Sequence, residues 1–444
     1  MPLLRGQMRW LLIGWMFAIS AVAFLDRVNI SIAGSSIEKD FGIDHVHFGW
    51  VLSAFVLGYA LFQAPGGRLA DRFGPRRILA LGTVWWAVFT SLTAFVRPGV
   101  SGAFLILIIV RFLLGVGEAV VYPASNRLVA SWIPRHERGV ANGFIFAGVG
   151  AGAGITPPLI TYILINYGWR WSFWVSALIG LAAGIAWYAV SRDRPQDHPW
   201  VDGVERAYIQ SGIVSNTTAE SPRPLAWRTI FTSKNVAAIT FSYFCFGYVA
   251  YIFFSWLFIY LSRVRGLDLK SSSYYSMLPF IAMAIGSPLG GWISDGIASF
   301  TGKPRSRCAV AFASMALCSI FIAMGTAVHS VSLASIVLAG GAGALYLSQS
   351  AFWSVTSDIA GGSSGSVSGV MNMGGQIGGV VTASLTPVIA KYFGWGTSFF
   401  VAAGVCGIGS LLWFWVHPER ELISLETIPV SVQPIASGTL KERT

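Results

Sequence analysis

Long apolar segments follow one another along the chain, with mostly short polar connections between them. A helix needs about 20 mainly apolar residues to cross a bilayer, and twelve segments meet that length. They cover residues 10–33, 46–66, 78–96, 101–126, 139–167, 171–191, 235–262, 271–294, 308–328, 330–357, 359–390 and 392–416. The pattern therefore predicts an all-α integral membrane protein with twelve transmembrane helices.

One long polar connection, rich in proline, separates the sixth segment from the seventh. It divides the chain into an N-terminal six-helix bundle (1–191), a central loop (192–234), a C-terminal six-helix bundle (235–416) and a tail (417–444). Within the loop, Val201, Val204, Tyr208 and Ile209 have the spacing of one short amphipathic helix. We expect this helix to lie at the cytoplasmic membrane surface.

Lysine and arginine are unevenly distributed between the two sides of the predicted membrane. With the N-terminus inside the cell, 21 of the 30 basic residues fall in cytoplasmic segments, seven on the opposite side and two within spans. Because cytoplasmic loops are enriched in basic residues, both termini are predicted to lie in the cytoplasm. The expected location is the inner (plasma) membrane.

The two halves of the chain repeat each other. Seven residues of the first half recur 226 positions later as the same residue types: Gly139, Gly143, Gly148, Gly152, Gly168, Trp169 and Phe173. Gly66, Gly67 and Asp71 recur 224 positions later as Gly290, Gly291 and Asp295. Two related bundles can expose a site at their interface alternately to either side of the membrane. The repeat therefore predicts a transporter.

Four charged residues lie within the spans, and all fall on the first and fourth segments: Asp26, Arg27, Arg111 and Glu118. Each costs about 2.5–3.5 kcal/mol at a helix centre on insertion scales, so four cost on the order of 10 kcal/mol. Uncharged residues stand at the repeat-related positions, namely Ala250, Tyr251, Val337 and Ala344. The fold does not need these charges, which indicates a function. The alternative is two ion pairs that only hold helices together.

The spacing of these charges sets what each can contact. Arg111 and Glu118 share a helix face but stand about 10 Å apart along it, so each needs a partner elsewhere or a ligand. Asp26 and Arg27 point about 100° apart. We expect Asp26 in the outer half of the membrane and Glu118 in the inner half. Burial favours the protonated acid where no cation is near, and the histidines all lie in loops or at membrane edges. Asp26 and Glu118 are therefore the predicted proton carriers.

The connection after the second segment reads Gly67-Arg68-Leu69-Ala70-Asp71-Arg72-Phe73-Gly74-Pro75-Arg76-Arg77. It resembles the signature loop of the major facilitator superfamily, G-x-x-x-D-R-x-G-x-R. An acid at the cytoplasmic end of a helix can pair with basic groups on the other bundle and hold one state closed. The second half keeps a weaker copy that contains Asp295. We predict that Gly67, Asp71, Arg72, Arg76 and Asp295 form a conformational latch.

Further segments resemble the anion:cation symporter family, whose members carry sugar acids, aromatic acids and sialic acid. These are Phe24-Leu25-Asp26-Arg27-Val28-Asn29, the stretches 111–119 and 132–139, and Asp193-x-Pro195-x-x-His198-Pro199. The likeness extends to about residue 420. The resemblance implies proton symport of an organic anion without a metal or cofactor.

The resemblance also implies a set of site residues. Arg27 would bind the substrate carboxylate, while Asp26 and Glu118 would couple the proton. Tyr59 corresponds to a tyrosine in the second span of the family. We also expect Arg111, one of the four charges within the spans, to bind substrate. In the C-terminal half, the implied hydroxyl and ring contacts are Ser350, Trp353, Asn372 and Gln376.

The fifth segment departs from the family pattern. Sugar-acid carriers often place a glutamine there, whereas this chain has glycine at every second position from Gly148 to Gly154, which is typical of helix packing. The expected substrate is a sugar acid such as a hexuronate, aldonate or aldarate. An aromatic or other small carboxylate stays open as the substrate, as do sodium coupling and exchange as the mode of transport.

The amino-acid composition excludes or disfavours several classes of function. Charged residues make up 11% of the chain, against about 25% in soluble domains. The net charge of +11 is spread over short connections, which argues against a nucleic-acid groove. No catalytic or phosphate-binding motif is present, and the four cysteines lack metal-ligand spacing. An enzyme is therefore disfavoured, while a channel or a transporter-like sensor stays open. The expected partners are a small organic anion, protons and the lipid bilayer, with the chain as a monomer.

Overall fold

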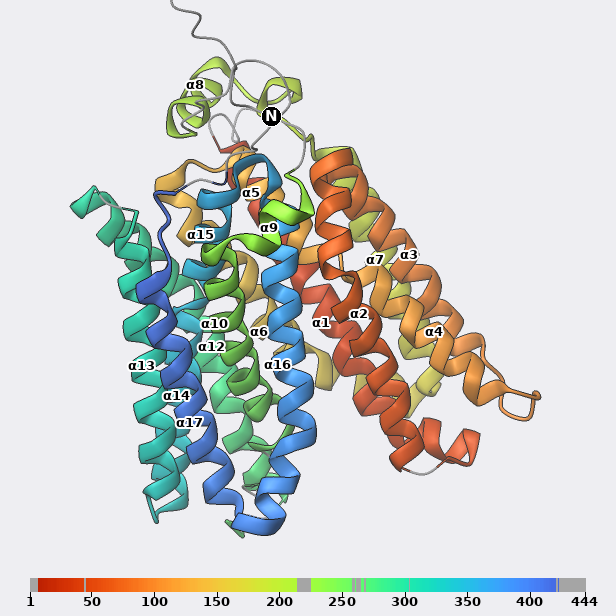
Figure 1. The fold of residues 1–444 in the computed structure, drawn as a ribbon. Helices are drawn as coiled ribbons and strands as arrows, with labels where there is room; N and C mark the ends of the chain where they lie inside the picture. The colour runs from red at the N-terminus through yellow and green to blue at the C-terminus, as the bar shows by residue number, and fades with distance from the viewer. Residues whose placement is uncertain are drawn as a thin grey trace, which may run out of the picture.

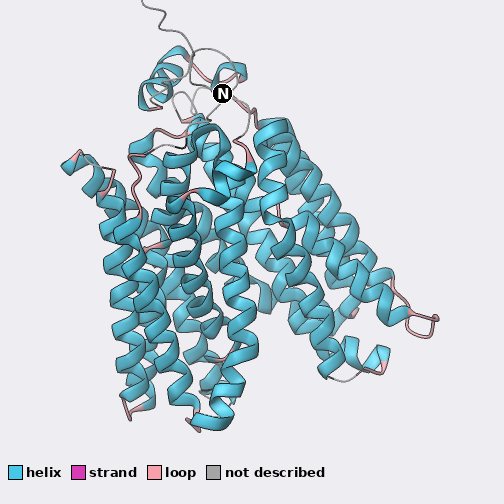
Figure 2. Cartoon of the chain, in the orientation of Figure 1, coloured by secondary structure: helices cyan, strands magenta, loops and turns pink. Residues whose placement is uncertain are grey.

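The computed structural model describes residues 7–43, 45–213, 225–257, 260, 265–266, 269–302, 304–420 and 422. These residues form helices and connecting loops, without a strand in the part described (Figure 2). The α-helices are α1 (Met8–Phe41), α2 (His45–Phe73), α3 (Pro75–Phe95), α4 (Ala103–Glu118), α5 (Val121–Trp132), α6 (Arg138–Tyr167), α7 (Trp169–Val190), α8 (Gly203–Gly212), α9 (Trp227–Thr232), α10 (Lys234–Ser255), α12 (Leu269–Thr301), α13 (Ser306–Ala327), α14 (Val331–Leu347), α15 (Gln349–Ala360), α16 (Ser364–Phe393) and α17 (Trp395–Leu411).

The long helices form two groups that stand side by side (Figure 1). Helix α1 packs against α6 and α7 in the first group, and α10 packs against α16 and α17 in the second. The groups meet where α6 contacts α12 and α2 contacts α16. Helices α8 and α9 lie at the end of the molecule where α1 begins, which we call the N-terminal side (Figure 1).

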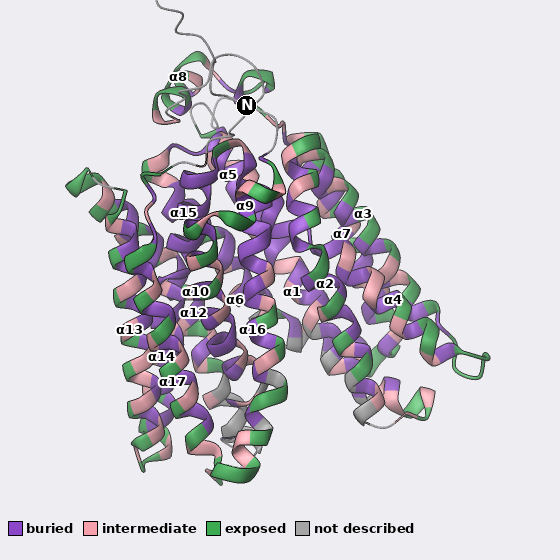
Figure 3. Cartoon of the chain, viewed as in Figure 1, coloured by how far each residue is buried: buried purple, intermediate pink, exposed green. Residues whose placement is uncertain are grey.

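Apolar side chains cover the outside of the helices. Leu81, Ile185 and Trp292 are 65%, 61% and 68% exposed, and the buried residues follow the faces where helices meet (Figure 3). Large apolar side chains are exposed in this way where the surrounding solvent is lipid. The four cysteines are free and buried, as expected of packing residues.

Nine helical stretches of the described residues are long and apolar enough to cross a membrane. One of them, Val331–Phe393, has 63 residues and is long enough for two crossings. Helices α2 and α6 are not among the nine, but their 29 and 30 residues also exceed the length of a span. Together these helices account for the twelve predicted crossings.

The fourth and tenth segments are each broken into two helices. Pro123 lacks an N–H, and its ring crowds the carbonyl four residues earlier, which explains the break at Ala119. The second break lies at Ser348, 228 or 229 positions after the first. The repeat offset here is therefore larger than the 226 read from the sequence. The counterpart of Glu118 is a residue at 346 or 347, not Ala344, and it is still uncharged.

The same contact occurs twice between the two groups. The carboxylate of Asp71 accepts a hydrogen bond from the backbone N–H of Ser366 at 2.6 Å, at the start of α16. The carboxylate of Asp295 accepts one from the backbone N–H of Val140 at 2.7 Å, at the start of α6. Ser366 stands 226 positions after Val140, and Asp295 stands 224 after Asp71. The internal repeat therefore corresponds to a pseudo-twofold arrangement of the bundles.

Glycines allow the backbones to touch at these contacts. A Cβ atom on Gly67 would collide with the carbonyl oxygen of Gly365, and one on Gly291 would collide with that of Gly139. The described hydrogen bonds between the two groups all lie in the half of the molecule nearer the N-terminal side. The described structure is therefore closed on that side.

The motif from Asp193 to Pro199 fixes the central loop to the first group. Asp193 accepts a hydrogen bond from the backbone N–H of Arg76 at 2.9 Å and so caps α3. The ring of His198 lies 2.8 Å from the carbonyl oxygen of Val190, and burial lowers the pKa of that imidazole. The motif has a structural role in this chain.

Helix α8 is the amphipathic helix predicted in the central loop, but its buried face differs from the prediction. Val201 and Ile209 are buried, whereas Val204 is 79% exposed. Glu205, two turns before the end of the helix, is buried because it accepts hydrogen bonds from the backbone N–H groups of Met8 and Arg9 at 3.2 and 3.1 Å. A carboxylate of the loop thus caps the start of α1, and this polar contact turns Val204 outward.

Candidate functional site

An ion pair joins the two charged spans. Arg27 on α1 donates a hydrogen bond from Nε to Oε1 of Glu118 on α4, at 2.6 Å. Glu118 is fully buried, and the side chain of Arg27 is 16% exposed. The partner that Glu118 was expected to need is therefore the residue predicted to bind substrate. The second oxygen of Glu118 and Nη2 of Arg27 are buried without a hydrogen-bond partner among the described residues.

Aromatic rings surround the Arg27 guanidinium. Its Cζ atom lies 4.1 Å from the ring centre of Tyr59, 5.0 Å from that of Phe24 and 5.5 Å from that of Phe55. The Cζ atom of Arg111 lies 5.0 Å from the same Phe55 ring. The rings stabilise both cations through their faces and exclude water from them.

Asp26 faces away from the pair. Its Oδ2 accepts hydrogen bonds from Nε1 of Trp86 and, at 3.1 Å, from Oγ1 of Thr90, both on α3. Because Asp26 precedes Arg27 directly, and Arg27 contacts Glu118, the two acids belong to one group of charges. The placement of Asp26 in the outer half of the membrane and of Glu118 in the inner half stays a prediction. Arg111 is 1% exposed, and its Nε and Nη1 atoms have no partner among the described residues.

Two predicted C-terminal residues lie in polar pairs with tyrosines. Gln376 accepts a hydrogen bond from the hydroxyl of Tyr251 at 2.7 Å, and Trp353 donates one to the hydroxyl of Tyr243 at 3.3 Å. Tyr251 stands 224 positions after Arg27 in the repeat. Its side chain connects to the Arg27 surroundings through ring contacts, Tyr251 with Phe254 at 5.9 Å and Phe254 with Phe24 at 6.5 Å.

The other two predicted C-terminal residues are engaged elsewhere. Asn372 donates a hydrogen bond to Oε1 of Gln63 at 2.9 Å, across the interface of the two groups. The hydroxyl of Ser350 donates to the backbone carbonyl of Ser287 at 2.9 Å. Ser350 is fully buried, and no described contact joins it to Arg27.

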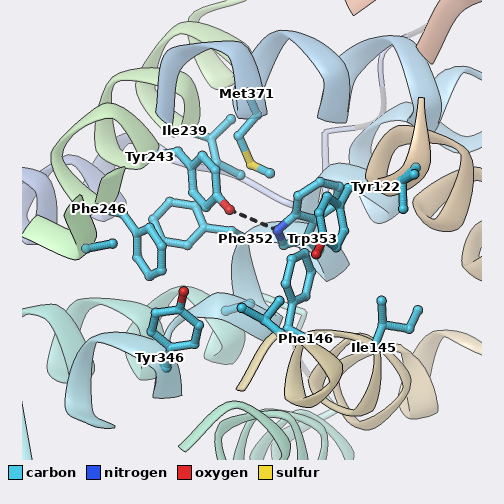
Figure 4. Close-up of a cluster of buried hydrophobic side chains, with 14 of the residues drawn as sticks. Tyr122, Ile145, Phe146, Ile239, Tyr243, Phe246, Tyr346, Phe352, Trp353 and Met371 are labelled. Atoms are coloured by element: carbon cyan, nitrogen blue, oxygen red, sulfur yellow. Dashed lines mark hydrogen bonds between the residues drawn. The ribbon is translucent and has the colours of Figure 1, made fainter. Parts of the chain in front are cut away.

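An aromatic stack joins the two groups on the N-terminal side of the ion pair. The rings of Tyr122 and Phe146 stack with centres 4.9 Å apart, and the Phe146 ring lies 5.0 Å from that of Trp353 (Figure 4). The figure also shows the hydrogen bond between Trp353 and Tyr243. The stack brings α5 and α6 together with α15, which belongs to the other group.

The glycine run of α6 packs against neighbouring backbones. A Cβ on Gly148 or Gly152 would collide with backbone atoms of Phe17 and Ala21 on α1, and one on Gly150 would contact Ala284 on α12. These glycines therefore serve close helix packing, which was the structural reading of the run.

The predicted latch residues divide into two sets. Asp71 contacts the start of α16 and lies 3.7 Å from Nε of Arg127. Its main partners are thus backbone N–H groups of the other bundle, whereas basic groups there were expected. Arg76 donates to the carbonyl oxygen of Tyr188 within its own group, and Arg72 lies against the adjacent Phe73 ring. Neither arginine makes a described hydrogen bond between the groups.

The sequence did not predict a buried ionic cluster that lies beside Asp295. Asp358 accepts hydrogen bonds from Nη1 of Arg138 at 2.7 Å and from Nη1 of Arg307 at 3.0 Å. Arg307 also donates to Asp295 at 2.8 Å. Asp358 follows the predicted end of the tenth span by one position, so an acid at the edge of a span was the available signal.

Comparison with known proteins places the chain among transporters. The sequence model of the Major Facilitator Superfamily matches residues 16–383. The chain is 34% identical over 422 residues to the probable sulfoacetate transporter SauU of Cupriavidus necator, covering 93% of this chain and 95% of the relative. It is 29% identical over 436 residues to the probable galactarate/D-glucarate transporter GudP of Escherichia coli, covering 95% and 93%.

The fold is similar to that of a solved transporter. A structure of the proton:xylose symporter XylE superposes with a TM-score of 0.74, covering 95% of this chain and 98% of that chain at 15% identity. At this identity the likeness concerns the fold alone. Together with the family match, it confirms the predicted fold of twelve membrane helices in two bundles.

Proposed function

The chain belongs to the Major Facilitator Superfamily, and on that basis we propose that this multi-pass membrane transporter moves a small organic anion together with protons. Relatives named for sulfoacetate, galactarate and D-glucarate support the class of substrate. The two bundles support alternating access, with the side closed in the described structure facing the cytoplasm. This orientation follows from the basic residues of the connections.

The observation that carries the proposal is the buried pair of Arg27 with Glu118. A guanidinium binds one carboxylate in bidentate fashion through two parallel N–H groups. Glu118 occupies Nε at 2.6 Å, so a substrate carboxylate must compete with Glu118 for the same group. The two anions cannot share Arg27 in a buried site without an uncompensated charge.

Protonation resolves this competition. A proton that adds to the carboxylate of Glu118 makes it a neutral acid, which releases Arg27 for the carboxylate of the anion. When the proton leaves on the other side, Glu118 regains its charge and displaces the anion from Arg27. Asp26, on the other face of α1, is the second proton carrier in this proposal.

The substrate class rests on the side chains around Arg27. The guanidinium of Arg27 lies over the ring of Tyr59. Tyr251 and Gln376 contribute polar atoms from the other bundle. These groups suit a sugar acid that carries hydroxyls beside its carboxylate. The glycine run of α6 offers no polar side chain, and this observation favours a short sulfonated acid as a second candidate. Where the substrate carries a second anionic group, as an aldarate or a sulfonated acid does, Arg111 would bind it.

The conformational latch is part of the proposal. Asp71 and Asp295 each hold the start of a helix in the opposite bundle, at 2.6 and 2.7 Å. Breaking both contacts separates the bundles on the side that is closed in the described structure. The same movement would break the hydrogen bond between Asn372 and Gln63. It would also separate Trp353 from the rings of Tyr122 and Phe146.

Counterflow in proteoliposomes tests the proposal. Labelled D-glucarate, galactonate, sulfoacetate and benzoate are each offered to vesicles loaded with the unlabelled compound. A carrier accumulates label transiently, whereas a channel or a sensor does not. For the accepted anion, uptake driven by an imposed pH gradient is then compared with uptake driven by a sodium gradient. Exchange of an organic anion with accumulation under the pH gradient alone is expected. Accumulation under sodium alone would replace the proton by sodium.

A further inference from the structure

Asp26 is buried in the first bundle, where its hydrogen-bond partners on α3 differ from the partner of Arg27 on α4. Asp26 is 3% exposed, and both residues that donate to it, Trp86 and Thr90, are 1% exposed. Both donors bind the same oxygen, Oδ2. The other oxygen, Oδ1, is buried without a described hydrogen bond, and the nearby Ser176 hydroxyl of α7 is the further polar group that acts on this carboxyl. The two oxygens of one carboxyl group therefore have different chemical surroundings.

The chemistry of Trp86 and Thr90 determines which oxygen of Asp26 can carry the proton of the neutral acid. An indole N–H only donates, so Oδ2 must accept from Trp86 whether the acid is ionised or neutral. A proton on Oδ2 would take the lone pair that Thr90 occupies and force that hydroxyl to turn from donor to acceptor, whereas a proton on Oδ1 disturbs neither hydrogen bond. The proton of the neutral acid therefore belongs on Oδ1. A carboxylate gains more from the indole than a neutral acid does, because hydrogen bonds to charged groups are the stronger ones.

The scaffold around Trp86 keeps the indole in place. Thr90 follows Trp86 by one helical turn and so lies on the same face of α3. On α7, Gly180 packs against the ring, and a Cβ there would lie 3.6 Å from the indole, in ordinary van der Waals contact. The other charged groups that act on Asp26 are Arg111 and Glu118 of α4, and α3 and α7 contribute none at this level among the described residues.

The repeat shows that this arrangement is not required by the fold. Helices α3 and α13 begin 231 positions apart, so the counterparts of Trp86 and Thr90 are Leu317 and Phe321, while the counterpart of Asp26 at the offset of 224 is Ala250. The C-terminal half lacks both the acid and the indole. The simpler role of Trp86 is to fill space in the core with its N–H satisfied, and that role predicts no link to protons.

We propose that Trp86 and Thr90 are positioning residues for proton coupling. They hold Oδ2 of Asp26 and leave Oδ1 as the atom that receives the proton. This inference rests on the proposed function, because it needs Asp26 to be a proton carrier. It adds two uncharged residues of α3 to the coupling machinery.

The test compares the pH profiles of variants that keep or remove a donor. Trp86→Phe and Thr90→Val remove one donor each, whereas Thr90→Ser keeps the hydroxyl. Trp187→Phe is the matched control, because this buried indole of the same bundle donates to the carbonyl oxygen of Arg76 at 3.2 Å, away from Asp26. Each variant is assayed in proteoliposomes for gradient-driven uptake between pH 5 and 9.

Loss of a donor makes the ionised acid less favourable, so the acid stays protonated to higher pH. The alkaline limb of uptake should move upward by about one to two pH units in Trp86→Phe, and by less in Thr90→Val. Thr90→Ser and Trp187→Phe should keep the wild-type limb, even where their transport rate falls.

The outcomes separate the inference from the proposed function. A wild-type protein that shows no accumulation under a pH gradient overturns both. Accumulation by the wild type, with unchanged limbs in Trp86→Phe and Thr90→Val, overturns the positioning role alone. If Trp86→Phe does not fold, the pair Thr90→Val and Thr90→Ser decides, because the two differ by one hydroxyl. An equal shift in Trp187→Phe also contradicts the role, since it would mark a general effect of losing an indole.

Discussion

Replacing Glu118 with glutamine tests the competition at the centre of the proposed mechanism. In the structure Glu118 holds Nε of Arg27 at 2.6 Å in a fully buried setting. Glutamine keeps the size and an oxygen acceptor but carries no charge. The anion then competes with a neutral group for Arg27. We expect the variant to bind the anion more tightly than the wild type at neutral pH, and without the wild-type loss of affinity as the pH rises.

The size of the effect follows from the hydrogen bond that changes. A hydrogen bond to a charged group contributes about 1.5–3 kcal/mol, and one between neutral groups about 0.5–1.5 kcal/mol. The difference of about 1–1.5 kcal/mol corresponds to a Kd that is about tenfold lower. The same variant cannot release a proton at position 118. It should therefore exchange the anion in counterflow at close to the wild-type rate and fail to accumulate it under a pH gradient.

The assays are ligand binding in detergent across a pH series and two transport measurements on one batch of proteoliposomes. Glu137→Gln is the matched control, because Glu137 accepts a hydrogen bond from Nε of Arg9 at 3.0 Å, outside the site. This control should leave affinity and accumulation unchanged. Wild-type accumulation by Glu118→Gln would refute the reasoning and leave coupling to Asp26 alone. Loss of both exchange and accumulation would instead favour an ion pair that only holds α1 to α4.

Three further variants probe the anchor, the latch and the bundle contact. Arg27→Lys should weaken anion binding about tenfold or more while the protein still inserts, because lysine lacks the bidentate fork; near-normal Kd in detergent would remove Arg27 from the site. Asp71→Asn replaces an acceptor of backbone N–H groups with an amide, so net uptake should slow several-fold with Kd within a few-fold; a large loss of affinity at normal uptake would contradict the latch role. Gly67→Val should abolish most net uptake, since its side chain meets the backbone of Gly365 and blocks closure; wild-type uptake in this variant would show that the bundles do not close at that contact.

The fold was predictable because a lipid environment restricts the secondary structure that a spanning segment can adopt. A segment without water must satisfy its backbone hydrogen bonds internally, so length and apolar content suffice to predict a spanning helix. The repeat then predicted the two bundles, and the contacts of Asp71 and Asp295 reproduce it. The break between α4 and α5 has a local signal in Pro123. The starts of α4 and α14 lie 228 positions apart, and this larger offset shifts the counterpart of Glu118.

The contacts of the site were less predictable than its members. The charges on α1 and α4 were evident from their cost in lipid, but their partners depend on how each helix is rotated about its axis. Arg27 meets Glu118 across 91 positions of sequence, while the adjacent Asp26 turns to α3. The available signal for α3 was a donor pair one turn apart, Trp86 and Thr90, inside an apolar segment. Such a pair of donors is common in helices. It indicates a role at Asp26 only once the structure shows that the carboxyl group lies beside it.

The four charges within the spans give a physical reason for the proposed coupling between anion and protons. Two acids, Asp26 and Glu118, and two cations, Arg27 and Arg111, sum to zero in the first bundle. An anion that enters makes this sum negative, and a buried charge without compensation is costly in lipid. One proton for each anionic group restores neutrality, and the two acids can take up two. A substrate with two anionic groups, such as an aldarate or a sulfonated acid, would match that capacity. In this proposal, the coupling of anion transport to protons follows from the charge balance of these four residues. Their charges again sum to zero once the anion and the protons have left.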